Sequence, residues 1–272
     1  MQTYDACVQT WTIGHIEITR VDDPDFDLVL PQDAVSAANL LEAGWLHPHF
    51  VSEDGALVIG SSATVIRAPD TVLLVDPFLA FDDPSKLGPR LNALRDVGIE
   101  ADDVDIVVNT HLDGLGVNLL ADGSPTFPRA RYLLPRQELE AVREGTHGQS
   151  AEARGLIHLW ADGPYEATEG TERLADGVRL EDAPGHNPGH HVVWIESGSE
   201  SAVIVGHLFL HPAQIALPDI DNGDLDPVLL AETRRDLLGR CALQRSLLIG
   251  PLFAGPGAGV VEPHGETWRL AL

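Results

Sequence analysis

The sequence predicts an α/β protein in which two β-sheets pack together and helices cover their outer faces. Two observations lead to this prediction. Strand-like segments precede a helix, and the same order returns in the second half, where a long helix lies close to the end. No linker composition and no exact repeat divides the 272 residues. A chain of this length can form one large domain or two small ones, and we expect a single domain over residues 1–272.

Strand patterns dominate the beginning of the chain. Residues 6–20 alternate between apolar and polar side chains, as in a half-buried strand. Residues 22–49 are rich in Asp and Pro, with a short helical pattern at 34–43, which predicts an irregular excursion that lines a pocket. Further strands are expected at 56–59, 62–67 and 71–75.

Helices and strands then follow one another to the end. Apolar residues recur at helical spacing from Lys86 to Val97, and Gly98 ends this helix. The short apolar strand Asp105–Asn109 places His111 just past a strand end. More helices are expected at 135–143 and 227–241, and more strands at 132–134, 178–180, 191–196, 202–205 and 247–249. We expect the last of these to be the final strand, before a glycine-rich turn at 255–259.

The composition argues against several classes of function. A formal net charge of −25 and the scattering of the few basic residues leave no stripe that would bind nucleic acid. Cys7 and Cys241 are the only cysteines and form no C-x-x-C motif, so no disulfide framework or thiolate zinc site is indicated. Without a signal-peptide pattern or a run of ~20 apolar residues, we expect a cytoplasmic protein with no membrane partner. The oligomeric state stays open.

Histidines at strand ends and glycine turns are the residues most suited to chemistry. They fall in three groups, at 109–114, 184–191 and 205–207. Each group follows or precedes a predicted strand, so each can bring an imidazole or a carboxylate to one cleft. We expect the loops at 76–82, 110–118, 184–191 and 206–212 to form this cleft.

Several motifs resemble those of metallo-β-lactamase-fold hydrolases. The similar segments occur in the family's order, and the resemblance extends from about Trp45 to Trp268. It implies an αβ/βα four-layer sandwich. The segments that carry it are Leu73–Asp76, Asp105–Leu112, Phe127–Tyr132, Ala183–His190, Ile204–His207 and His211–Gln214.

The family's first metal-binding motif, H-x-H-x-D-H, is incomplete here. The corresponding run is His111-Leu-Asp-Gly-Leu-Gly116. Aligned without a gap, only His111 is retained, and Asp113 stands at the second histidine. With two residues deleted, Asp113 becomes the family's aspartate instead. Both alignments remain open.

The later family ligands are also changed. His190 matches the third histidine, His207 stands where the family has an aspartate that bridges two metals, and Leu252 stands at the final histidine. In the ungapped alignment the lost ligands, Leu115, Gly116 and Leu252, all belong to the second metal position. The resemblance therefore implies at most one transition-metal ion (Zn, Fe or Mn). Its implied ligands are His111, Asp113, His190 and His207.

No metal at all is the competing interpretation, because histidines in glycine turns also serve as simple hydrogen-bonding groups. His111, Asp113 and His207 would then act as acid and base, or the protein would bind a ligand without chemistry. The resemblance gives Asp76 a supporting role behind the ligand loop, and we expect His186 to stabilise its turn next to the ligands and not to bind the ion itself. Five side chains are candidates for the substrate pocket, although core packing is an equal alternative for the aromatic ones: Trp45, Phe50, Phe78, Phe81 and His211.

Three functions follow from these alternatives. The first is a metal-dependent hydrolase acting on an ester, lactone, amide or thioester of a small molecule. The second is a non-hydrolytic mononuclear-metal enzyme of natural-product biosynthesis, catalysing oxidation, decarboxylation or cyclisation. The third is a metal-free acid/base catalyst or a binding protein. Metal analysis separates the third function from the other two.

Overall fold

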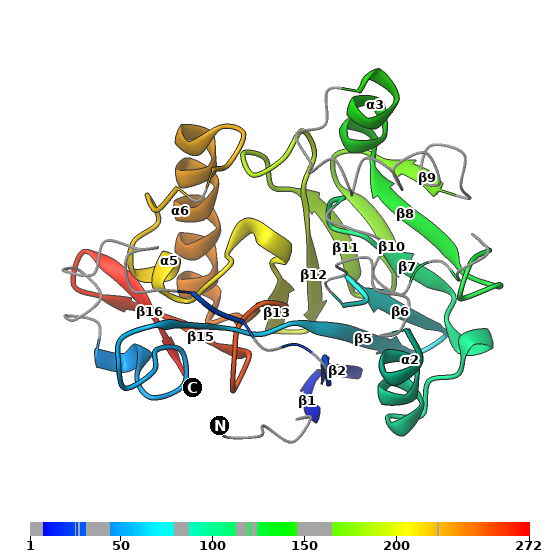
Figure 1. The fold of residues 1–272 in the computed structure, drawn as a ribbon, viewed down its shortest axis with the longest axis horizontal. Coiled ribbons are helices and arrows are strands. Elements are labelled where there is room, and N and C mark those ends of the chain that lie inside the picture. The colour runs from blue at the N-terminus through cyan, green and yellow to red at the C-terminus, as the bar shows by residue number, and fades with distance from the viewer. Residues whose placement is uncertain are drawn as a thin grey trace.

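Two seven-stranded β-sheets form the centre of the protein, as a computed structural model shows (Figure 1). The structure describes residues 8–24, 26, 28–30, 44–78, 87–112, 118, 120, 124–145, 165–221 and 223–272. The expected helical pattern at 34–43 lies outside these residues.

The first sheet has the order β1-β2-β5-β6-β7-β8-β9. Its strands are antiparallel from β1 to β6 and parallel from β6 to β9. A parallel pair needs a crossover connection, and helix α2 (Leu87–Asp96) lies in the one between β6 and β7. The strands are β1 Val8–Ile13, β2 Ile16–Asp22, β5 Ser62–Ala68, β6 Thr71–Val75, β7 Ile106–Val108, β8 Arg131–Pro135 and β9 Tyr165–Thr168.

The second sheet has the order β10-β11-β12-β13-β14-β15-β16. Its neighbours are antiparallel except β13 and β14, which are parallel and are connected through α6 (Pro227–Gln244). The strands are β10 Glu172–Ala175, β11 Val178–Asp182, β12 His191–Ser197, β13 Glu200–Ile204, β14 Leu247–Ile249, β15 Ala258–His264 and β16 Thr267–Ala271.

Smaller elements surround the sheets. Strands β3 (Leu28–Leu30) and β4 (Leu57–Ile59) form a separate pair. Two short helices are α3 (Arg136–Glu144) and α5 (Ala213–Ala216). Three 3₁₀ turns complete the described elements: η2 Gly44–Leu46, η4 Ala101–Asp103 and η5 Gly206–Leu208.

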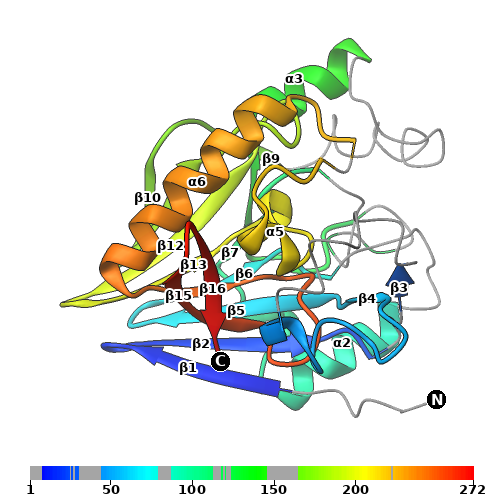
Figure 2. The same cartoon turned by 90° about the vertical axis from the view of Figure 1, so that its left-hand side faces the viewer.

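Buried apolar side chains define the layers. One cluster lies between the sheets, where Ile18 and Ile66 of the first meet Val193 and Ile204 of the second. Another packs α2 against the outer face of the first sheet, and a third packs α5 and α6 against the second. Figure 2 shows α2 and α6 on opposite outer sides. The predicted αβ/βα sandwich is confirmed.

The C-terminal region differs from the sequence prediction. Strand β14 is followed by the hairpin β15–β16, so it is not the final strand. The hairpin begins within the expected glycine-rich turn, where Gly257 has a φ of 65° and leaves room for the buried guanidinium of Arg20. Helix α6 begins at the predicted residue but extends to Gln244, because Arg245 adopts the left-handed conformation that ends it.

None of the helices in the described ranges is long and apolar enough to cross a membrane.

Candidate metal centre

His111 follows β7 and is oriented through Thr110 and Asp76. The Asp76 carboxylate accepts hydrogen bonds from the Thr110 backbone N–H and hydroxyl, both at 2.8 Å. The Thr110 oxygen also lies 3.1 Å from His111 Nδ1. Because this hydroxyl donates to Asp76, it accepts a hydrogen bond from the N–H at His111 Nδ1, and the lone pair of His111 is then on Nε2, which faces His207 Nδ1. The tautomer follows from this network.

His207 enters the site from η5, directly after β13. Gly206 has a φ of 52°, and a Cβ there would lie 2.7 Å from His190 Nε2. The turn therefore requires glycine. It places His207 Nδ1 3.0 Å from His111 Nε2, with both rings buried.

His186 lies in the turn between β11 and β12, which rests on the start of α6. The His186 and Gly185 carbonyls accept hydrogen bonds from the N–H groups of Leu225 and Asp226, at 3.0 and 2.8 Å. The ring centroid of His186 is 5.2 Å from that of His111 and 5.6 Å from that of His207.

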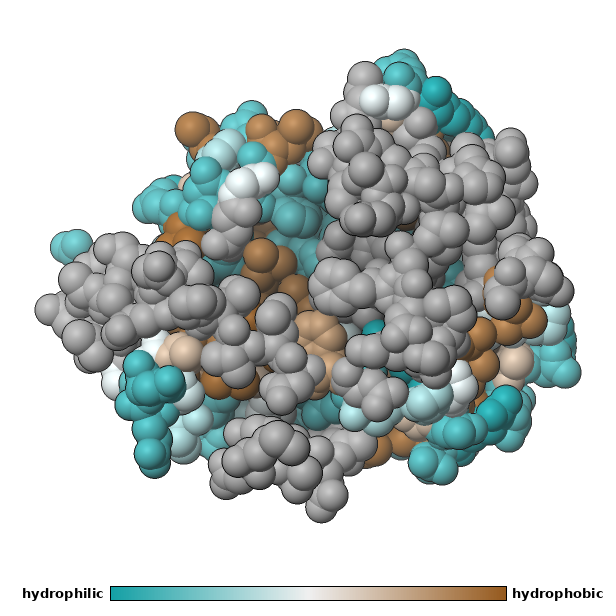
Figure 3. Space-filling view, in the orientation of Figure 1, coloured by the Kyte–Doolittle hydropathy of each residue, from teal (hydrophilic) through white to brown (hydrophobic). Residues whose placement is uncertain are grey.

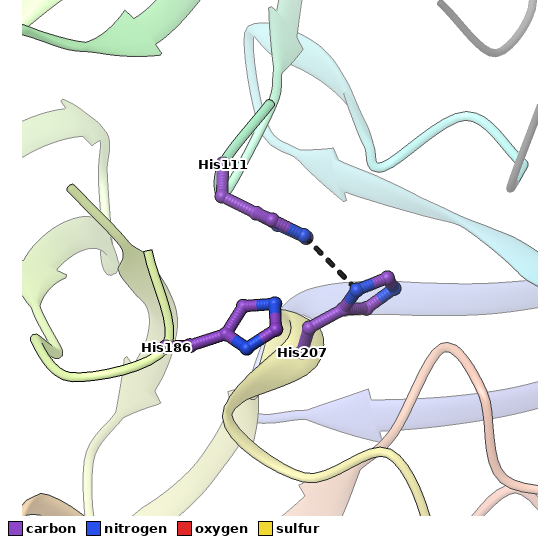
Figure 4. A group of neighbouring side chains, drawn as sticks. All are labelled: His111, His186 and His207. Atoms are coloured by element: carbon purple, nitrogen blue, oxygen red, sulfur yellow. Dashed lines mark hydrogen bonds between the residues drawn. The ribbon is translucent and has the colours of Figure 1, made fainter. Parts of the chain in front are cut away.

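These three histidines form one compact donor group (Figure 4). One ring nitrogen from each lies within 4.8 Å of the others, and no second group of this kind occurs among the described residues. Two nitrogens bound to one zinc ion at about 2.0–2.1 Å in tetrahedral geometry are about 3.3 Å apart. The cluster therefore suits a single ion after small side-chain movements. Three histidines with an open fourth position are also a known catalytic zinc arrangement.

His190 lies beside the cluster but its Nε2 already has a partner. It accepts a hydrogen bond from the His207 backbone N–H at 3.1 Å, and its ring centroid is 5.1 Å from that of His111. Its Nδ1 is buried without a hydrogen-bond partner among the described residues. Burial, with the neighbouring histidines, lowers the pKa of His190 well below its ordinary value, so the ring is neutral.

Four residues at family ligand positions remain, and the structure describes one of them, Leu252. Asp113, Leu115 and Gly116 lie outside the described residues. Leu252 is buried, and its carbonyl accepts a hydrogen bond from Gly60 at 2.8 Å. A leucine side chain offers no lone pair at this position.

Most of the expected pocket residues pack in the interior. Phe50 is fully buried and meets Trp45 and Phe253 edge to face. Phe78 is also buried, with the Arg90 guanidinium 5.8 Å from its ring centre. Phe81 lies outside the described residues.

His211 connects the loop after η5 to the segment at Phe50. Its Nδ1 accepts from Ala213 N–H at 3.0 Å, and its Nε2 donates to the Phe50 carbonyl at 2.7 Å. Burial lowers the pKa of His211 to about 4. These contacts give His211 a structural role in joining two loops.

Asp224 is a site residue that sequence reasoning did not find. Its Oδ1 lies 2.6 Å from His186 Nδ1, and its side chain is 1% exposed. The Asp-rich segment 219–226 before α6 signals a polar turn, but no spacing rule connects it to a histidine 38 residues earlier.

The order of the strands and a histidine cluster at loops of both sheets define an αβ/βα sandwich with a candidate metal centre. The family model described as the metallo-beta-lactamase superfamily matches residues 57–114 and 125–250, more than half of the chain. The chain belongs to this superfamily.

Individual relatives are more distant. The N-acyl homoserine lactonase AiiA of Bacillus thuringiensis subsp. kurstaki is 30% identical over 118 residues, which are 42% of this chain and 42% of that protein. The chain thus matches less than half the length of this curated relative.

Solved structures are similar over almost the whole chain. AidC, a dizinc quorum-quenching lactonase in complex with a product, has a TM-score of 0.80 at 16% identity, covering 98% of this chain and 97% of its own. The hydrolase AbOPH of the beta-lactamase superfamily has a TM-score of 0.77 at 21% identity, with coverage of 98% and 97%. At these identities the likeness concerns the fold.

Proposed function

We propose that this chain is a metal-dependent hydrolase of a small molecule, acting on a lactone or ester, with amides and thioesters as chemically related alternatives. The observation that carries the proposal is the cluster of three histidine nitrogens within 4.8 Å of one another. Membership of the superfamily and the hydrolases among its relatives support the same reaction class.

The proposed ion is a single transition metal held by His111, His186 and His207. Neutral imidazoles suit zinc, while Fe²⁺ and Mn²⁺ remain candidates. A bound ion of this kind supplies Lewis-acid polarisation of a carbonyl and an acidified water. Leu252 at a lost family position favours one ion over two. Asp113 stays our candidate for a further carboxylate that binds the ion or moves a proton.

The protein's own groups hold the three rings ready. Asp76 and Thr110 keep the Nδ1 proton on His111, and Asp224 accepts a hydrogen bond from the N–H at His186 Nδ1. His207 Nδ1 donates to His111 Nε2. His207 Nδ1 would hold a cation only in the tautomer that carries the ring proton on Nε2. The site is thus preorganised for a cation at two of its three rings.

Exposed apolar side chains that follow Asp224 in the sequence are candidates to contact an apolar part of the substrate. Leu225, Val228 and Leu229 are exposed at the start of α6, directly after Asp224. Figure 3 shows brown atoms in the region where Figure 1 places this helix. An exposed apolar group beside a polar site is a common feature of ligand binding.

Elemental analysis combined with a hydrolysis assay tests the proposal. Protein purified without chelators or a histidine tag should contain one transition-metal ion per chain and hydrolyse members of a lactone and aryl-ester panel. His207→Ala should lower metal content and activity together, and His207→Asp should not produce a two-ion site. Two ions at full occupancy, or none under metal-replete conditions, would contradict the proposal. Oxygen consumption during turnover would favour the non-hydrolytic alternative instead.

A further inference from the structure

The pair formed by His186 and Asp224 has the geometry of a charge-assisted hydrogen bond. Nδ1 and Oδ1 are 2.6 Å apart, and the two side chains are 16% and 1% exposed. A carboxylate this deeply buried is costly unless it is hydrogen-bonded. As the acceptor, Asp224 keeps the proton on His186 Nδ1, so the lone pair of His186 is on Nε2.

Backbone contacts on both sides hold this pair in place. Gly185 and His186 accept hydrogen bonds from Asp226 and Leu225, so the turn and the residues after Asp224 are connected directly. Before Asp224, the Asp221 carboxylate accepts hydrogen bonds from the N–H groups of Gly223 and Asp224, at 2.8 and 3.0 Å. The backbone of Asp224 is therefore held on both sides along the chain.

A buried arginine joins the same segment to His207. Arg234 of α6 donates to the Ile220 carbonyl at 2.6 Å and to the Leu208 carbonyl at 2.7 Å. Leu208 follows His207 directly, and Ile220 precedes the Asp221 turn. One guanidinium thus sets the spacing between the loop that carries His207 and the loop that carries Asp224.

His190 is held differently. Its Nε2 lone pair accepts the His207 backbone N–H, whereas the Nε2 lone pair of His186 is left by its bond to Asp224. Its ring also lies close to Gly206, where even a Cβ would come within 2.7 Å of Nε2. These contacts suit a ring that positions the His207 loop.

We propose that Asp224 is a positioning residue that makes His186 the third metal donor, and that His190 instead orients the His207 loop. The inference rests on the proposed function, because it concerns the same ion. A carboxylate behind a ligating histidine fixes its tautomer and orientation and raises its basicity. The cluster in Figure 4 then combines a histidine of the first sheet with two from the second, and Asp224 acts on it through His186.

Metal affinity of the full-length chain tests the role of Asp224. Apo protein is titrated with Zn²⁺ against a chromophoric chelator at one neutral pH, and Co²⁺ absorption reports the ligand field. We expect Asp224→Asn to weaken Zn²⁺ binding about 10- to 100-fold and to change the Co²⁺ spectrum. The matched control is Asp219→Asn, which removes an exposed carboxylate paired with Arg235 in the same segment. It should bind Zn²⁺ as the wild type does.

Two glutamine variants separate His186 from His190. We expect His186→Gln to weaken Zn²⁺ binding more than His190→Gln, and the reverse order would overturn the assignment. Wild-type affinity in Asp224→Asn would also overturn it while leaving the proposed function intact. A wild-type chain that binds no ion would instead refute the proposed function.

A measurement on the wild type covers the case in which a variant does not fold. Long-range ¹H–¹⁵N NMR of histidine-labelled apo protein reports which ring nitrogen of His186 carries the proton. We expect the Nδ1-protonated tautomer. The Nε2-protonated tautomer would show that Asp224 does not hold His186 in this way and would overturn the inference.

Discussion

The burial of His211 makes the stability of the protein depend on pH. Both ring nitrogens are engaged, Nδ1 as acceptor from Ala213 and Nε2 as donor to Phe50. Protonation would place a second hydrogen against the Ala213 N–H inside the core. The folded protein therefore keeps this ring neutral, with a pKa lowered from 6.5 to about 4 by burial.

The direction and size of the effect follow from proton linkage. Below pH 6.5 the unfolded chain takes up a proton at His211, while the folded chain does not until the pH approaches about 4. The contribution is fully present above 6.5 and is lost as the pH falls through this window. Each pKa unit corresponds to about 1.4 kcal/mol, so the free energy of unfolding decreases by about 3 kcal/mol.

Urea denaturation of wild type and His211→Asn at several pH values measures this effect. Asparagine can still accept a hydrogen bond from Ala213 N–H but does not titrate. The free energy of unfolding of the wild type, relative to that of His211→Asn, should therefore decrease by about 3 kcal/mol between neutral pH and pH ~4.5. His264→Asn removes an exposed histidine and is the control, because its stability relative to the wild type should not change over the same pH range. A stability difference between wild type and His211→Asn that stays constant over this range would refute the reasoning.

Three further changes have defined outcomes. Arg90→Ala removes one partner of the buried ion pair between Arg90 and Asp23, which are 2.6 Å apart, and urea denaturation should show a loss of about 3–5 kcal/mol; a loss below about 1 kcal/mol would contradict the cost of breaking a buried ion pair. Gly206→Ala places a Cβ against His190 Nε2 at a φ of 52°, so we expect a lower melting temperature and weaker Zn²⁺ binding, and unchanged values would show that the turn can relax. Leu252→His restores one family ligand, and elemental analysis should still find no more than one ion per chain; a second ion at full occupancy would refute the single-ion site.

Much of the fold could be predicted because buried strands leave a local pattern. The runs at 71–75 and 202–205 are recovered as β6 and β13, and their ends place Asp76 and His207 next to the cluster. The hairpin β15–β16 was missed because Gly, Pro and charged residues interrupt its apolar alternation. Its stability comes from pairing in the sheet, which no local window reveals.

The candidate site was predictable only in part, because the contacts that shape it are long-range. His111, His190 and His207 do lie together, as their position after or before strands suggested. His186 contacts Asp224, 38 residues further along the chain, and the buried positions of Phe50 and Phe78 depend on neighbours from other elements. Residue type and spacing alone do not predict such long-range contacts.

The histidine cluster joins the two halves of the sandwich. His111 follows a strand of the first sheet, whereas His186 and His207 belong to connections of the second. An ion held by all three would act as a cross-link that only the assembled protein can make. Metal concentration would then act on folding itself: at 100 times Kd the stabilisation is about 2.7 kcal/mol. A thermal melt at increasing Zn²⁺ would thus measure occupancy of the site before any substrate is known.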